Sequence, residues 1–232
     1  MKKVFIVLLI AIFAIPAAKA QINKGAILLG GSLGFYQRKT TDEDPIFNNH
    51  TKFKQNETSF SFLPESGFFI SNSFVLGIGL GYQHNKSEFN VYTDNDLDYL
   101  HEKNTNKILV NPYSEKYFKI GNNIYITLAA NINLGFGKKN EKFHNNDTIE
   151  DITGNTFSLD IFITPGITYF ISKNWALSGN AGKIYYSYNS TEMIKNGNDN
   201  NYNSNTNNYG VSFSFNTFSI GIRYYLRNGT KE

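Results

Sequence analysis

The sequence contains no cysteine and only five prolines. Without cysteine the chain has no disulfide framework and no thiol that could carry a lipid anchor, so any attachment to a membrane must come from the folded chain. Proline removes one hydrogen-bond donor from a β-ladder, and its scarcity therefore leaves long stretches free to form strands. The 20 phenylalanines and 15 tyrosines favour strands over other structure.

An excess of charge is also missing once the N-terminus is set aside. Three of the 22 lysines and arginines lie in the first 20 residues, which leaves 19 basic residues against 19 acidic ones. With no basic excess, nothing in the charge balance argues for nucleic acid, and we expect no nucleic-acid partner. After residue 20 no apolar run reaches the about 20 residues that a transmembrane helix needs.

The N-terminus has the pattern of a cleavable signal peptide over residues 1–20. Lys2 and Lys3 precede the apolar run Val4–Ile15, and Ala18-Lys19-Ala20 forms an A-x-A cleavage site. The twelve-residue run fits a signal-peptide core and is too short to span a membrane. We therefore predict an exported protein whose single domain covers residues 21–232.

A strand is most clearly predicted at residues 124–136, where every second residue is apolar. Because side chains alternate between the two faces of a strand, one face is wholly apolar and the other is small or polar. The pattern alone leaves two solvents open: a soluble sandwich would bury the apolar face, and an outer-membrane barrel would turn it toward lipid. The residues predicted to face lipid are Ile124, Ile126, Leu128, Ile132, Leu134 and Phe136.

Similar alternation predicts eight strands, with a β-bulge near Gly182 and another near Asn216. Long polar segments, interpreted as loops, follow every odd-numbered strand, and short turns follow the second, fourth and sixth strands. One short turn repeats: Phe69-Ile70-Ser71-Asn72-Ser73-Phe74-Val75-Leu76 returns as Phe170-Ile171-Ser172-Lys173-Asn174-Trp175-Ala176-Leu177. The predicted strands cover residues 24–36, 57–70, 74–92, 107–118, 124–137, 155–170, 174–188 and 209–226.

Long and short connections that are segregated in this way are typical of an all-β fold, an eight-stranded antiparallel up-and-down transmembrane β-barrel. The face opposite the apolar one is mostly Gly, Ser, Thr, Ala and Asn, which suits a narrow lumen better than a surface that must dissolve in water. Aromatic residues also gather beside the short turns, where an interfacial girdle belongs. These interfacial aromatics are Phe68, Phe74, Phe118, Tyr169 and Trp175.

On these features the mature chain resembles the small eight-stranded outer-membrane β-barrel proteins of the OmpA-like and OmpX-like group. The resemblance is carried by Gly30–Phe35, Phe69–Gly81, Asn111-Pro112-Tyr113, Tyr169–Gly179 and Ser219–Leu226. It implies the outer membrane of a Gram-negative envelope as the location. It also implies outer-membrane lipids and lipopolysaccharide, the barrel-assembly machinery and an unknown extracellular partner of the loops as the partners.

Four charged residues are assigned to the lumen: Glu65, Glu115, Asp160 and Arg223. An unpaired charge in a confined interior is costly, so we predict that they form one ion-pair network that plugs the barrel.

Two short motifs match catalytic or metal-binding patterns, but neither lies in the structural setting that its pattern requires. Gly30-Gly31-Ser32-Leu33-Gly34 matches a nucleophile elbow but lies inside a predicted strand instead of a strand-to-helix turn. Asp94–Asp98 resembles the start of a calcium loop, yet Tyr99 and Thr105 stand where glycine and glutamate are needed. We predict no catalytic, cofactor or metal residues.

The predicted function is that of a non-enzymatic barrel acting through its surface loops, in surface interaction, adhesion or envelope integrity. A narrow pore and a soluble periplasmic ligand-binding barrel are the alternatives.

Overall fold

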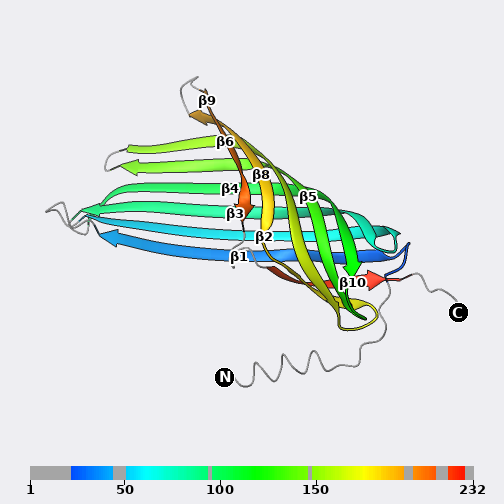
Figure 1. Ribbon diagram of the computed structural model, residues 1–232. Helices are drawn as coiled ribbons and strands as arrows, with labels where there is room; N and C mark the ends of the chain where they lie inside the picture. The colour runs from blue at the N-terminus through cyan, green and yellow to red at the C-terminus, as the bar shows by residue number, and fades with distance from the viewer. Residues whose placement is uncertain are drawn as a thin grey trace, which may run out of the picture.

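A computed structural model describes residues 22–43, 51–93, 96–145, 148–195, 201–212 and 219–227. The predicted signal peptide, the predicted bulge near Asn216 and most of the polar C-terminal tail lie outside these residues. Strands and turns account for nearly all of the described chain (Figure 1). Within it there is no α-helix of the length and apolar character required to traverse a bilayer.

Ten labelled strands make up one antiparallel sheet. Their bounds are β1 Ile27–Glu43, β2 Lys52–Ser71, β3 Phe74–Thr93, β4 Asp96–Lys119, β5 Ile124–Asn145, β6 Thr148–Phe170, β7 Trp175–Asn180, β8 Lys183–Lys195, β9 Asn201–Ser212 and β10 Ser219–Leu226. Eight of them close a ring in the order β1-β2-β3-β4-β5-β6-β7-β10, because β5 pairs with β6 and β10 pairs with β1. The predicted eight-stranded antiparallel barrel is confirmed.

The two remaining strands, β8 and β9, extend the sheet beyond β7 on the side away from the short turns. β8 follows β7 after Ala181 and Gly182 and pairs with β6, and β9 pairs with β8. Gly182 has a φ of 74°, in the left-handed region that favours glycine. The register against β6 shifts by one residue here, from Gly166 opposite Asn180 to Ile163 opposite Ile184. The bulge predicted near Gly182 is therefore present, and it divides one long predicted strand into β7 and β8.

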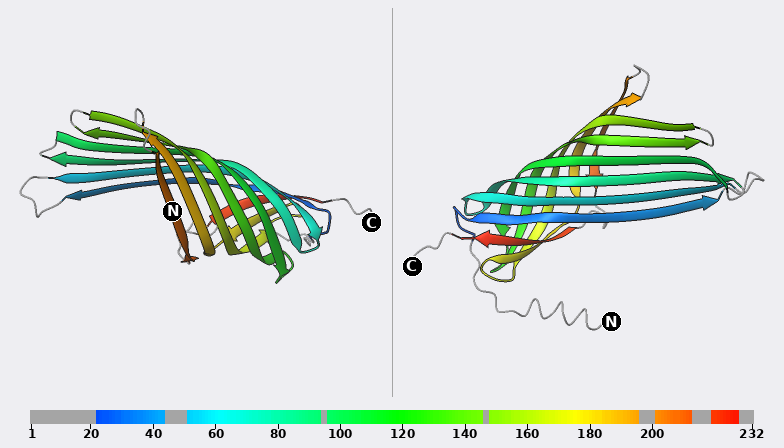
Figure 2. Two further views of the ribbon diagram at one scale, coloured as in Figure 1. Left: turned by 90° about the horizontal axis from the view of Figure 1, so that it is seen from above. Right: turned by 180° about the vertical axis from the view of Figure 1, so that it is seen from behind.

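The strands are longer than the sequence indicated. The segments 37–53, 94–106, 138–154 and 189–208 were interpreted as loops because they are polar, yet most of their residues lie in strands. Only residues 94–95 separate β3 from β4, and only 146–147 separate β5 from β6. A ladder with water on both faces can be polar on both faces, so polarity here does not end the strand. Figure 2 shows these strands running side by side along the molecule.

The core lies at the end of the barrel that carries the short turns. There β2 and β3, β4 and β5, and β6 and β7 are joined, and β10 pairs with Ile27–Leu29 of β1 (Figure 1). The buried apolar residues at this end are Ile22, Ala26, Leu28, Phe69, Val75, Tyr113, Tyr117, Tyr125, Phe170, Ala176 and Tyr225. The barrel is thus filled by side chains at one end.

Candidate functional site at the short-turn end

Aromatic rings from five strands meet inside the barrel just above the short turns. Tyr225 lies at the centre, with its ring 4.7 Å from that of Phe170 and 6.0 Å from that of Phe69. Tyr117 and Tyr125 complete the cluster, with their ring centroids 6.1 Å apart. Tilted and edge-to-face pairs of this kind add to the free energy gained by burying the rings.

The repeated turn explains how this core is built. Phe69 and Phe170 occupy the same place in the two copies of the turn, and both are buried. Val75 and Ala176, the matching residues after each turn, have no exposed surface. The two copies therefore deliver equivalent apolar side chains from opposite parts of the ring to one core.

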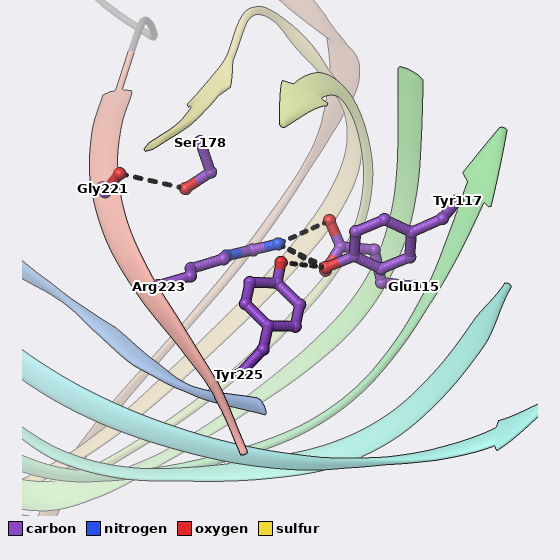
Figure 3. A network of polar contacts seen from close by, with 6 residues as sticks. All are labelled: Glu115, Tyr117, Ser178, Gly221, Arg223 and Tyr225. Atoms are coloured by element: carbon purple, nitrogen blue, oxygen red, sulfur yellow. Dashed lines mark hydrogen bonds and ion pairs between the residues drawn. The ribbon is translucent and has the colours of Figure 1, made fainter. Parts of the chain in front are cut away.

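A buried ion pair crosses the barrel directly beside these rings (Figure 3). Nη1 of Arg223 on β10 donates to both carboxylate oxygens of Glu115 on β4, at 2.8 and 2.7 Å. The hydroxyl of Tyr117 donates to Oε2 of Glu115 at 3.0 Å and lies 3.1 Å from the hydroxyl of Tyr225. Glu115 is 1% exposed, so its charge depends on these partners for stabilisation.

Glu65 on β2 lies close enough to this pair to interact with it electrostatically. Its interaction with Arg223 is larger than its interaction with Glu115. A Cβ added at Gly79 would come within 3.0 Å of Cγ of Glu65, so the glycine leaves the space that this side chain occupies. A Cβ at Gly77 would collide with the ring of Tyr113. The glycines of β3 thus make room for the larger groups that fill the lumen.

Asp160 does not belong to the predicted four-residue network. It lies on β6 farther from the short turns and accepts a hydrogen bond from the hydroxyl of Ser187. Its electrostatic influence reaches Lys107, not Arg223. The prediction failed here because sequence alternation assigns a residue to a face of the strand but does not fix its depth along the barrel.

The residues predicted to face lipid lie on the outer wall. Ile132 is 41% exposed, whereas Tyr125 on the opposite face of β5 is 5% exposed. Ile126, Leu128 and Phe136 share the exposed face, and Ile124 and Leu134 are half-buried on it. Of the predicted interfacial aromatics, Phe68, Phe118 and Trp175 are exposed, and Phe74 and Tyr169 are half-buried.

The outer wall becomes charged beyond Tyr82 of β3. Nζ of Lys86 contacts Oε1 of Glu88 and lies 2.9 Å from Oε1 of Glu102 on β4. Hydrogen bonds to Glu88 and Glu102 raise the pKa of Lys86 to about 12, and Lys86 lowers the pKa of Glu88. This cross-strand cluster shows that β3 and β4 continue as a water-exposed ladder.

We expect the exchange Lys86→Gln to destabilise the barrel only slightly, by less than about 1 kcal/mol near pH 7, because the cluster is exposed. A carboxylate whose folded pKa is lowered stabilises the fold above its unfolded value, about 4.3 for Glu, and loses this contribution as the pH falls. The difference between wild type and K86Q in urea unfolding should therefore shrink as the pH falls below about 4.3 and vanish once the carboxylates are protonated. A difference that persists in acid would contradict this assignment.

The other motifs take no part in a site. Gly30–Gly34 lies within β1 and forms no strand-to-helix elbow. His101 stacks on Phe143, and Nδ1 of His84 lies 2.8 Å from the side-chain oxygen of Asn106. No group of three metal-ligating side chains occurs in the part of the chain that the structure describes. Asp94 and Asn95 of the calcium-loop resemblance lie outside that part.

Sequence reasoning placed Tyr113, Glu115, Tyr117 and Arg223 in the lumen. It missed Phe69, Phe170 and Tyr225 as members of one core. The doublets at Phe68-Phe69, Tyr169-Phe170 and Tyr224-Tyr225 were the available signal, because consecutive large rings in a strand place one ring on each face.

These observations define an antiparallel barrel with an apolar outer wall and a core at one end, which is the class of transmembrane β-barrels. The model of the outer membrane protein beta-barrel domain family matches residues 5–215, and the chain belongs to this family. Membership assigns the protein to the outer membrane.

No curated protein matches the sequence. Among solved structures, the ferric yersiniabactin uptake receptor FyuA from Yersinia pestis is similar at 8% identity with a TM-score of 0.33. The match covers 84% of this chain and 44% of the receptor chain, so this chain spans less than half of the receptor.

Proposed function

We propose that the protein is a non-enzymatic outer-membrane barrel that is closed at its periplasmic end and acts through its outer, water-exposed strands. The roles that fit are surface interaction, adhesion or support of envelope integrity. Its partners would be outer-membrane lipids and lipopolysaccharide, the barrel-assembly machinery and an extracellular molecule. The observation that carries the proposal is the plug, which we define as the aromatic core together with the Glu115–Arg223 ion pair.

The apolar belt has the height that a membrane requires. From Ile124 to Phe136 the strand β5 is about 40 Å long, which is about 30 Å along the membrane normal at the usual tilt of barrel strands. A hydrocarbon layer is about 30 Å thick. The residues of β5 beyond Phe136 then stand in water outside the cell, and they carry the lysines and glutamate of that strand.

The plug argues against the narrow-pore alternative. An eight-stranded barrel encloses only enough space for its own side chains, and here that space is occupied by aromatic rings and by the Glu115–Arg223 ion pair. Membership in an outer-membrane family leaves the soluble periplasmic alternative without support.

Planar-bilayer recording tests the closed barrel. We expect purified, refolded protein to give no stepwise conductance, because the plug leaves no continuous water path between the two sides. A preparation from mock-transformed cells controls for contaminating porins. Reproducible conductance steps that depend on the protein would refute the proposal in favour of the pore.

Cell fractionation and proteolysis of intact cells test the location and the orientation of the barrel separately. We expect the protein in the outer-membrane fraction, released only by detergent, and a shift in gel mobility on boiling, because a folded barrel runs more compactly than the unfolded chain. Proteolysis of intact cells should cleave the outer connections and spare the short turns. Cleavage at the short turns in intact cells would reverse the proposed orientation.

A further inference from the structure

A cavity lies on the inner side of the curved sheet, beyond the plug and toward the ends of the strands that lie away from the short turns. Its volume is about 430 Å³, and strands β3, β4, β5, β6, β8 and β9 all contribute to its wall. Every residue lining it is Lys, Asn, Thr or Ser, and none is acidic or apolar. We call this cavity the outer chamber.

Three lysines give the outer chamber its charge. Lys103 and Lys107 lie on the inner face of β4, and Lys139 lies on β5 opposite Thr105, which stands between them. Nζ of Lys107 lies 3.4 Å from the side-chain oxygen of Asn189 on β8. Lys103 and Lys107 lie two residues to either side of Thr105, and Lys139 is paired with Thr105, so all three side chains line the same cavity.

Of the three lysines, Lys139 forms an ion pair with a described carboxylate, that of Glu141, which also acts electrostatically on Lys103. Glu141 lies 2.6 Å from Nζ of Lys139 and also approaches Nε2 of His101 at 3.5 Å. Within the described residues no carboxylate oxygen lies within 4 Å of Nζ of Lys103 or Lys107. Asp160 influences Lys107 from a greater distance and is itself hydrogen-bonded to Ser187. The outer chamber thus keeps a positive surplus.

Partial burial, together with the positive charge of Lys139, lowers the pKa of Lys103. The positive charges repel one another in this space. A bound anion would offset the repulsion and favour the charged forms of the lysines. The walls of a concave site also concentrate the field of such charges on its interior. The lowered pKa of Lys103 agrees with its position close to Lys139 in the cavity wall.

The remaining lining groups indicate what else the ligand carries. Hydroxyls of Thr156, Thr191 and Thr206 and the amides of Asn85 and Asn189 can both donate and accept hydrogen bonds. Such groups recognise ligand hydroxyls and offer nothing to an acyl chain or an aromatic ring. The volume lies in the range of about 300 to 1,000 Å³ that is usual for small-molecule sites.

We propose that the outer chamber binds a water-borne, hydroxyl-rich anion, of the class of phosphorylated or sulfated sugars, with Lys103 and Lys107 contacting the anionic group. This deepens the proposed function, on which it rests for the outward opening of the chamber. Because the plug closes the other end, the ligand enters and leaves from the cell exterior and does not cross the membrane.

Glucose 6-phosphate is a suitable probe. In a ³¹P NMR titration of the refolded chain in a phosphate-free detergent, we expect saturable line broadening of the probe. The double exchange K103Q/K107Q should raise its dissociation constant about tenfold or more, since both charge-assisted contacts are lost. Added salt should weaken binding to wild type, as screening requires.

The matched control is K138Q/K142Q. It removes two lysines from the exposed outer face of β5 at the same height, and binding should stay within about twofold of wild type because neither side chain enters the chamber. Both double variants must show the heat-dependent mobility shift of a folded barrel. Neutral glucose should fail to displace the probe, and inorganic phosphate should bind more weakly because it lacks the sugar hydroxyls.

Absence of saturable binding to wild type would overturn the inference, as would equal loss of affinity in the two double variants. Inorganic phosphate binding as tightly as the probe would overturn the assignment of the sugar hydroxyls. These outcomes are separate from the test of the plug. Conductance would refute a closed barrel and leave a binding result intact, whereas absent binding would leave the closed barrel unaffected.

Discussion

Arg223→Ala should lower the free energy of unfolding of the refolded barrel by about 3–5 kcal/mol, because it leaves the buried Glu115 carboxylate without its cation. The exchange also removes a hydrogen-bond donor from Tyr117. Urea unfolding in detergent micelles can be followed by the fluorescence of Trp175. This is the single tryptophan of the chain, and its ring lies 4.8 Å from that of Tyr224 on β10.

Arg38→Ala is the matched control for this prediction. Arg38 pairs with Glu57 at 3.2 Å, but its side chain is 53% exposed, and such pairs contribute about 0–1 kcal/mol. The double variant Glu115→Gln with Arg223→Met should be less destabilised than Arg223→Ala alone, since the Glu115 carboxylate is then no longer left buried without its cation. A loss in R223A no larger than that in R38A would show that the ion pair does not stabilise the plug.

The second large effect is expected on the outer wall. Ile132→Arg should destabilise the barrel in lipid bilayers by about 2–4 kcal/mol, the cost of an arginine near the middle of the hydrocarbon layer. Ile132 lies in the middle part of the apolar face of β5, well inside the belt that ends at Phe136. The measurement is reversible urea unfolding in vesicles, again followed by Trp175.

Asn140→Arg provides the control on the same face of the same strand. Asn140 is exposed and lies four residues beyond Phe136, where the outer wall is already charged, so its replacement should cost within about 0.5 kcal/mol. Equal effects of the two arginines would mean that Ile132 does not face hydrocarbon. A smaller effect in N140R places the membrane boundary between the two positions.

The ring of eight strands was predictable because two local signals agree. Alternation along residues 124–136 separates the two faces, and the short turns identify one end of the barrel. The bulge at Gly182 was predictable as well, because the apolar phase of the strand slips there. In each case the information lies within a few residues of the feature it predicts.

The length of the strands was not predictable from polarity. Residues such as Lys86 and Glu102 resemble loop residues in sequence, yet they pair across β3 and β4 as exposed cross-strand partners. The depth of a residue along the barrel was equally hidden. Glu115 and Arg223 meet because β4 and β10 face each other at the same level, whereas Asp160, on an inward face as well, lies at another level.

The outer chamber shows the same limit. Lys103, Lys107 and Lys139 fall in segments that the sequence analysis interpreted as loops or strand ends. Only the continued pairing of β4 with β5 turns all three toward the inside. The three lysines could be read from the sequence. That they line one cavity could not, because it depends on the register between β4 and β5.

The ion pair that closes the barrel joins residues 108 positions apart in sequence, and one of them lies on β10, the most C-terminal of the described strands. Contacts of such wide separation form late, after the entropy of closing the intervening chain has been overcome. Until β10 docks beside β1, Glu115 and the rings of Tyr117 and Phe69 lack Arg223 and Tyr225. Completion of the plug therefore coincides with closure of the ring, and a chain truncated before β10 would retain an unneutralised carboxylate as a mark of unfinished assembly.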